Sequence, residues 1–293
     1  MRKILKDVVP TPAINVYRKI KRRKRYLEIV NDLPENVIVS YPKCGRTWLR
    51  AIINSSFYFQ FPQFAEEGFD QDVKSLMHLS TLDNTFPPLQ MTHDGKPMYH
   101  HHGELYKYKR EYYDRNVLLL TREPKDTLIS WYFHLTERDQ KNKISKENLD
   151  LSSIYAFLMN EYGGIKTYIQ FYNLWLAELK KMKSHKVVRY EDIRKDPVEQ
   201  VVEIFRFFGV ESIGHEAIKQ AVDKNELQKM KNRERQNLYN SDVIGVKNEQ
   251  TSNENAFKVR RGKIGGFKDY LSTQEIEAID SIIKKNLNHE FGY

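Results

Sequence analysis

The chain has 293 residues, of which 40% are hydrophobic and 12% aromatic, enough for a sizeable core, and 30% are charged. This charge content, and the lack of any apolar run near the ~18–20 residues that span a bilayer, exclude a membrane-embedded protein. The single cysteine excludes an internal disulfide, and the basic N-terminus lacks the apolar core of a secretory signal. We therefore expect a cytoplasmic protein, and the net charge of +9 suits a polyanionic ligand.

The first 30 residues form a basic segment, which we expect to be an arm or a helix. Residues 17–25 hold seven lysines or arginines. Such a run is typical of a solvated helix face, and it also allows a peripheral contact with anionic membrane lipids. We expect no nucleic-acid partner.

Predicted strands and helices alternate along the rest of the chain. Strands are predicted at Asn36–Tyr41, Leu89–Thr92, Asn116–Thr121 and Lys186–Tyr190. Helices are predicted at Thr47–Tyr58, Glu104–Tyr112, Lys125–His134, Ile154–Met159, Gly164–Lys183, Pro197–Phe208 and Gln274–Asn286. This alternation predicts an α/β fold with a central parallel sheet flanked by helices, and we expect one domain over residues 1–293.

The first anion-binding motif is the strand, tight loop and helix over residues 37–49. A loop before a helix directs backbone N–H groups and the positive end of the helix dipole at one point, which suits a phosphate or a sulfate. It is not the standard phosphate loop, because Lys43 precedes Gly45 and no Gly-Lys-Ser/Thr follows.

The second motif follows the apolar strand Val117–Leu120. Arg122 lies where this strand ends, which is the ligand edge of an open α/β sheet. Pro124 suits the first turn of the next helix, and Ser130 lies about two helical turns beyond Arg122. A guanidinium and a hydroxyl can therefore converge on one phosphate.

The third motif is the basic, glycine-rich run from Arg260 to Lys268. Cations and glycines together can close a loop on an anion. Residues 232–263 are polar and weakly periodic, so we expect a long mobile loop that covers the ligand site.

In this order and spacing the three motifs resemble those of sulfotransferases that use 3′-phosphoadenosine 5′-phosphosulfate (PAPS). The first is similar to Tyr-Pro-Lys-Ser-Gly-Thr-Thr-Trp, with Cys44 and Arg46 as departures. The second matches Arg-x-Pro-x-Asp followed by Ser. The third looks like Arg-Lys-Gly-x-x-Gly-Asp-Trp-Lys, with Gly266 and Phe267 replacing Asp-Trp. From about Val37 onwards, the resemblance implies the P-loop-kinase-like sulfotransferase fold of the cytosolic members.

The resemblance also implies the residues that bind PAPS and its product, adenosine 3′,5′-bisphosphate (PAP). Tyr190 lies in Tyr-Glu-Asp, whose tyrosine contacts adenine in the family. The scheme requires no metal. The implied cofactor-binding residues are Lys43, Cys44, Gly45, Arg46, Thr47, Trp48, Arg122, Ser130, Tyr190, Arg260, Arg261 and Gly262.

Lys43 and His93 are the predicted catalytic residues. His93 ends a short strand in Met-Thr-His, which looks like the family's Lys-Thr-His, whose histidine takes the acceptor proton; Met91 replaces the lysine. Lys43 is expected to stabilise the transferring group. The rival base is the triplet His100, His101 and His102, which is nearer to Arg122 in sequence.

The acceptor is a hydroxyl or an amine of a small molecule, lipid or sugar, which the sequence does not name. Aromatic residues are candidate walls of its pocket: Phe57, Phe59, Phe61, Phe64, Trp131, Tyr132 and Phe133.

Cys44 lies among cations at a helix N-terminus, so we expect a reactive thiolate. Lys268 and Glu277 match a family dimer motif only in part, so we expect a monomer or a weak dimer.

Two other classes of protein stay open. One is a nucleotide-dependent phosphotransferase (kinase) of P-loop architecture, against which the missing Gly-Lys-Ser/Thr argues. The other is a basic nucleic-acid or membrane adaptor that keeps the fold without turnover.

Overall fold

A computed structural model of the chain describes residues 11–65, 75–139, 146–236, 238–239 and 254–293. Its sheet has four parallel strands in the order β2-β1-β3-β4. The strands are β1 (Asn36–Ser40), β2 (Leu89–Thr92), β3 (Asn116–Thr121) and β4 (Ser184–Arg189). The predicted parallel sheet is thereby confirmed. β1 is buried along its whole length, as its continuous apolar run requires for a central strand.

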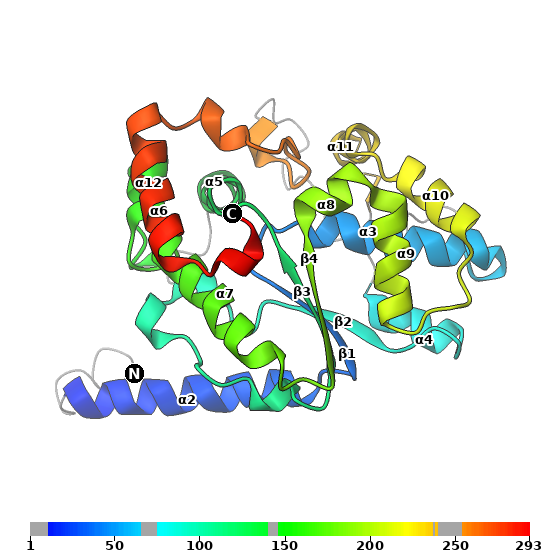
Figure 1. The fold of residues 1–293 in the computed structure, drawn as a ribbon, viewed down its shortest axis with the longest axis horizontal. Helices are drawn as coiled ribbons and strands as arrows, with labels where there is room; N and C mark the ends of the chain where they lie inside the picture. Colours follow the sequence, from blue (N-terminus) through cyan, green and yellow to red (C-terminus); the bar gives the residue numbers. More distant parts are fainter. Residues whose placement is uncertain (1–10, 66–74, 140–145, 237, 240–253) are drawn as a thin grey trace.

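Helices cover both faces of the sheet. Figure 1 shows α7 and α12 on one side and α3, α9 and α10 on the other. The helices are α2 (Thr11–Asn31), α3 (Arg46–Gln60), α4 (Leu79–Leu82), α5 (Pro124–Phe133), α6 (Ile154–Met159), α7 (Ile165–Leu179), α8 (Tyr190–Lys195), α9 (Pro197–Phe207), α10 (His215–Lys224), α11 (Leu227–Arg235) and α12 (Thr273–Asn286). None of the helices in the described ranges has the length and apolar character needed to cross a membrane.

The basic N-terminal segment is helical from Thr11, in α2. Tyr26 and Val30 bury their side chains in the core, and the Tyr26 hydroxyl donates to Asp94 Oδ1 at 2.8 Å. Arg22 and Arg23 form ion pairs with Glu104 and Glu111, so part of the positive charge is already neutralised within the protein.

The predicted helix Glu104–Tyr112 is wrong. Only short 3-10 turns occur there, at His102–Glu104 and Arg110–Tyr112. Lys109 explains the difference, because its Nζ pairs with buried Asp94 at 2.5 Å and its backbone N–H donates to Glu178. These tertiary bonds use groups that a regular helix would orient differently, and they override the local pattern.

Four helices of the structure were not predicted from the sequence: the short α4 and α8, and the longer α10 and α11. Because α11 extends to Arg235, the predicted loop over residues 232–263 begins later than expected. Residues 237 and 240–253 of that loop lie outside the described residues. Its last part contains a 3-10 turn, Glu254–Ala256, and the buried ring of Phe257.

The strand ends position the candidate site. The carboxyl ends of parallel strands lie along one edge of a sheet, which is where open α/β folds bind ligands. The loop with Lys43 follows β1, His93 follows β2, Arg122 follows β3 and Tyr190 follows β4.

Candidate active site

The loop between β1 and α3 has a conformation that few residues can adopt. Lys43 has φ of 73° and Gly45 has φ of 93°, both in the left-handed region. A Cβ on Gly45 would lie 2.4 Å from the Tyr190 ring, so only glycine fits there. The loop ends at the first turn of α3, where backbone N–H groups have no partner within the helix. This geometry suits the anion site that the sequence predicts.

Arg122 joins the second motif to the first. Its Nη1 donates to the carbonyl of Lys43 at 2.9 Å, and its guanidinium lies 4.5 Å from the centre of the Tyr190 ring. Its own carbonyl accepts a hydrogen bond from the Tyr168 hydroxyl. These contacts fix the guanidinium beside the first anion site.

Asp126 holds the third motif against α5. Its carboxylate accepts hydrogen bonds from the N–H groups of Gly265 and Phe267, both at 2.8 Å. The guanidiniums of Arg260 and Arg261 both donate to the Tyr270 hydroxyl, at 2.6 and 3.1 Å. The basic loop is therefore tied to the helix that carries Ser130.

The three motifs line one cavity of about 230 Å³. Its walls include all but one of the predicted site residues: Lys43, Gly45, Arg46, Thr47, Trp48, His93, Arg122, Ser130, Tyr190, Arg260, Arg261 and Gly262. The exception is Cys44. Residues distant in sequence are thus gathered in the arrangement that the motifs require.

The environment of Cys44 favours the neutral thiol, and not the thiolate that the sequence predicts. Its side chain is fully buried, with Sγ 3.3 Å from the Tyr172 hydroxyl and 3.9 Å from Thr127 Oγ1. Burial raises the pKa of the thiol to about 11, despite the opposing hydrogen bond with Tyr172. Desolvation outweighs the nearby cations, because the sulfur packs into the core and does not face the cavity.

His93 is half-buried and neutral. Burial lowers its pKa well below the usual value, and the positive charge of Arg46 lowers it further. Nδ1 lies 2.9 Å from the Ser40 carbonyl, and because a carbonyl only accepts, Nδ1 must donate. In the neutral ring Nε2 therefore carries the lone pair that a general base needs.

The residue after His93 fixes the end of β2. Asp94 is buried and accepts hydrogen bonds from Lys109, Tyr112, Trp175 and Tyr26. Its own backbone has φ of 47°, in the left-handed region. This network of four side chains from three separate segments holds the turn that carries His93.

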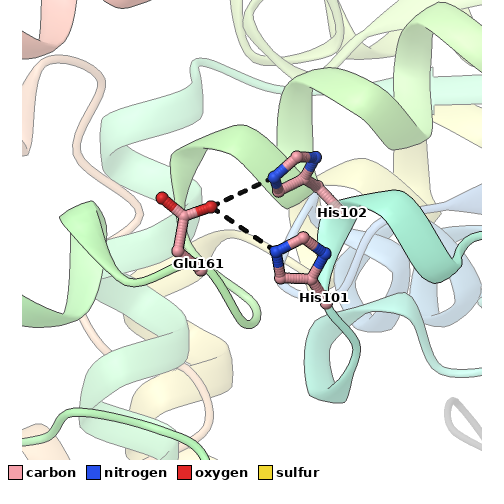
Figure 2. Close-up of side chains that lie close together, drawn as sticks. All are labelled: His101, His102 and Glu161. Atoms are coloured by element: carbon pink, nitrogen blue, oxygen red, sulfur yellow. Dashed lines mark hydrogen bonds and ion pairs between the residues drawn. The ribbon is translucent and has the colours of Figure 1, made fainter.

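The rival histidines do not line the cavity. Figure 2 shows His101 and His102 directed at Glu161, with His102 Nε2 and His101 Nε2 at 3.0 and 3.6 Å from Glu161 Oε2. His100 Nδ1 lies 3.2 Å from Arg22 Nη1. Within the described ranges, His101, His102 and Glu161 are the group with spacing suited to a metal ion. However, Gly103 N–H donates to His101 Nδ1, which places the ring proton on Nε2, the atom that a metal would need.

Most of the predicted aromatic walls lie elsewhere. Trp131 lines the cavity and stacks on His134, with ring centres 4.7 Å apart. Phe57 is buried against Phe86 in the core, and Phe59 is exposed. The other candidates, Phe61, Phe64, Tyr132 and Phe133, are also absent from the cavity lining.

Sequence reasoning missed Lys258 and Asn225. Lys258 lines the cavity, and burial, followed by the charge of Arg138, lowers its pKa to about 7. Lys258 lies two residues before Arg260 in the sequence, and this proximity to the third motif could have indicated that it belongs to the site. Asn225 is buried, and its carbonyl accepts the indole N–H of Trp48 at 2.8 Å, which orients that ring. No pattern in the sequence indicated this bond.

Comparison with known proteins identifies the family. The family model described as "Sulfotransferase domain" matches residues 33–291. The chain belongs to the sulfotransferase family. A flavonol 3-sulfotransferase of Flaveria bidentis is 25% identical over 85% of this chain and 80% of the relative. Sulfotransferase 2A1 of Mus musculus is 22% identical over 95% and 93% of the two chains. The prediction of a sulfotransferase is thereby confirmed.

Solved structures show the same fold. Mouse sulfotransferase SULT7A1 complexed with PAP has a TM-score of 0.57 at 18% identity, with 89% of each chain covered. Retinol dehydratase in complex with androsterone and PAP has a TM-score of 0.56 at 15% identity, covering 89% of this chain and 84% of that structure. The predicted sulfotransferase fold is thereby confirmed.

Proposed function

We propose that this sulfotransferase moves a sulfuryl group from PAPS to a hydroxyl or an amine of a small-molecule, lipid or sugar acceptor. One observation carries the proposal: a single cavity joins three cationic motifs to a half-buried neutral histidine. The related structures named above were solved with PAP, and a related enzyme is named for a flavonol acceptor.

The cavity residues fit the donor nucleotide. Arg122 Nε and Arg260 Nε are buried without a hydrogen-bond partner among the described residues, as expected of groups that await an anion. Arg122, Ser130, Arg260, Arg261 and Gly262 would hold the 3′-phosphate. Lys43, Thr47 and the N–H groups of residues 45–48 would hold the 5′-phosphate. Trp48 and Tyr190, whose ring centres lie 5.9 Å apart, would contact adenine.

His93 and Lys43 would carry out the chemistry. PAPS supplies the activated sulfuryl group and a stable leaving group. His93 Nε2 would take the acceptor proton as the acceptor oxygen or nitrogen attacks. Lys43 would stabilise the negative charge that spreads over the transferring oxygens. Burial and the charge of Lys258 lower the Lys43 pKa, so a bound anion would restore its positive charge.

The carboxylate that lines the cavity argues against the kinase alternative, because its oxygens are already occupied. Asp126 is the carboxylate in the described lining of the cavity, and both of its oxygens already accept backbone N–H groups. A P-loop kinase needs an available carboxylate to hold Mg²⁺ beside the phosphates.

Labelled substrates test the proposal. We expect transfer of ³⁵S from labelled PAPS to members of a panel of phenols, sterols, glycolipids and sugars, and no ³²P transfer from ATP with Mg²⁺. Melting temperature should rise with PAP, and not with ATP–Mg²⁺ or an oligonucleotide. Phosphate transfer without sulfate transfer would overturn the proposal.

Since several relatives are named cytosolic sulfotransferases, we also propose a cytoplasmic location.

A further inference from the structure

Positively charged side chains lie beside His93 in the cavity. Arg46 and Lys258 line the cavity together with His93. Arg50 lies one helical turn after Arg46 on α3, so the two guanidiniums share a face of the helix. The motif that this loop resembles has a threonine at position 46, so Arg46 is a departure from that motif.

Both arginines have unused hydrogen-bond donors. Arg46 Nη1 and Arg50 Nε are buried, and within the described part of the chain neither has a hydrogen-bond partner. Two like charges four residues apart on a helix destabilise it, and buried donors without acceptors add to the cost. Such a pair needs a compensating anion.

Arg46 is close to the proposed base. Burial has the largest effect on the pKa of His93, and the charge of Arg46 comes next, ahead of the charges of Lys258 and Arg50. Because Arg46 and His93 also line the same cavity, the Arg46–Arg50 pair lies near the base that would meet the acceptor.

The carboxylate beside Lys258 offsets little of this charge. Glu234 is fully buried, and its two oxygens accept the backbone N–H groups of Lys258 and Val259 at 2.6 and 2.8 Å. Its Oε1 lies 3.9 Å from Arg138 Nη1. One carboxylate thus faces Arg138 and Lys258, and the Arg46–Arg50 pair stays without a described counter-charge.

We propose that the acceptor carries an anionic group, a carboxylate or a phosphate, which Arg46 and Arg50 bind beside His93. This inference rests on the proposed function and names its substrate class. Guanidiniums present paired N–H donors that match both anions. The acceptor would enter with its hydroxyl at His93 Nε2 and its anion toward α3.

Binding of matched acceptor pairs to the PAP-loaded protein tests this at fixed pH and salt. The carboxylate pairs are 4-hydroxybenzoate with 4-hydroxybenzamide, and 4-hydroxyphenylacetate with 4-hydroxyphenylacetamide. 4-Hydroxyphenyl phosphate, compared with hydroquinone, is the phosphate arm. Calorimetry should show at least one anion binding roughly ten-fold or more tightly than its neutral partner, as loss of a charge-assisted pair predicts.

Substitutions on α3 and on the adjacent α10 test whether Arg50 causes the preference for the anionic acceptor. Arg50→Gln should bring the ratio of anion to neutral affinity close to one, and Arg50→Lys should keep most of it. Lys219→Gln, which removes the same charge from the exposed face of α10, should leave the ratio unchanged. Equal binding within every pair, or no binding of any anion, would overturn the inference while PAP binding still supported the proposed function. Failure to bind PAP would instead contradict the proposed function itself.

Discussion

At the residue scale, we expect substitutions of His93 and of Lys43 to have different effects on turnover and on PAP affinity. His93→Ala should lower turnover by ~10²–10⁴-fold, as loss of a general base does, and leave PAP affinity nearly intact. Lys43→Ala should lower both, because Lys43 contacts the anion in the ground state and in the transition state. Turnover, PAP affinity and melting temperature should be measured on the same preparations. Near-normal turnover of His93→Ala alongside an inactive His100→Ala or His102→Ala would transfer the role of base to the triplet.

The buried Cys44 should be unreactive in the folded protein. With its pKa raised to about 11 and its sulfur inside the core, little thiolate exists at pH 7. Labelling by iodoacetamide should therefore be slow with and without PAP, and become fast in denaturant. Fast labelling of the native protein that PAP blocks would restore the sequence-based expectation of a reactive thiolate.

Two partly buried histidines should make the protein acid-sensitive. Burial holds the pKa of His93 well below the unfolded value near 6.5 and lowers that of His134 to about 2. Below pH 6.5 the unfolded chain binds protons that the folded chain does not, so the free energy of unfolding falls as pH decreases. Denaturation in urea from pH 7.5 to 5 should show this slope, and His93→Gln should reduce it. An unchanged slope would mean that His93 is solvated.

At the element scale, Asp126 is the link between α5 and the third motif. Asp126→Asn loses a charge-assisted acceptor for two backbone N–H groups, so it should cost about 1.5–3 kcal/mol of stability and weaken PAP binding. The matched control is Asp280→Asn, which removes a half-exposed carboxylate that pairs with Lys125 of the same helix. This control should cost about 0–1 kcal/mol and leave PAP binding unchanged. Equal effects of the two changes would contradict the role given to Asp126.

The sequence predicts strands better than the connections between them. Apolar β-branched runs such as Val37–Val39 have one stable place, inside a parallel sheet, and all four predicted strands formed. The last strand, β4, begins two residues earlier than predicted, at Ser184, and Tyr190 belongs to α8. The segment Glu104–Tyr112 did not form a helix, since the Lys109–Asp94 pair joins positions whose proximity no local pattern reveals. Helix α11 has few apolar residues, so its hydrophobic periodicity is weak. It is held in place by hydrogen bonds of Arg233 with Asn225 and of Glu234 with Lys258, which the sequence does not reveal.

At the scale of the whole molecule, the sequence indicated which residues of the predicted anion site line one cavity, and it did not indicate the walls of the acceptor site. The anion-binding residues follow strand ends in local motifs, and the topology of a parallel sheet brings strand ends together. The acceptor side depends on which aromatic rings face the cavity, and most of the candidates turned into the core or away from the site. One domain over residues 1–293, and a monomer or a weak dimer, stay predictions.

The central claim is that this cavity binds an adenine nucleotide through its 3′-phosphate. Calorimetric titration with adenosine 3′,5′-bisphosphate and with adenosine 5′-monophosphate tests it most directly. Only the former engages Arg122, Ser130 and Arg260, so it should bind at least ~10-fold more tightly, as loss of a charge-assisted pair worth roughly 1.5–3 kcal/mol requires. Equal affinities for the two nucleotides would contradict the account.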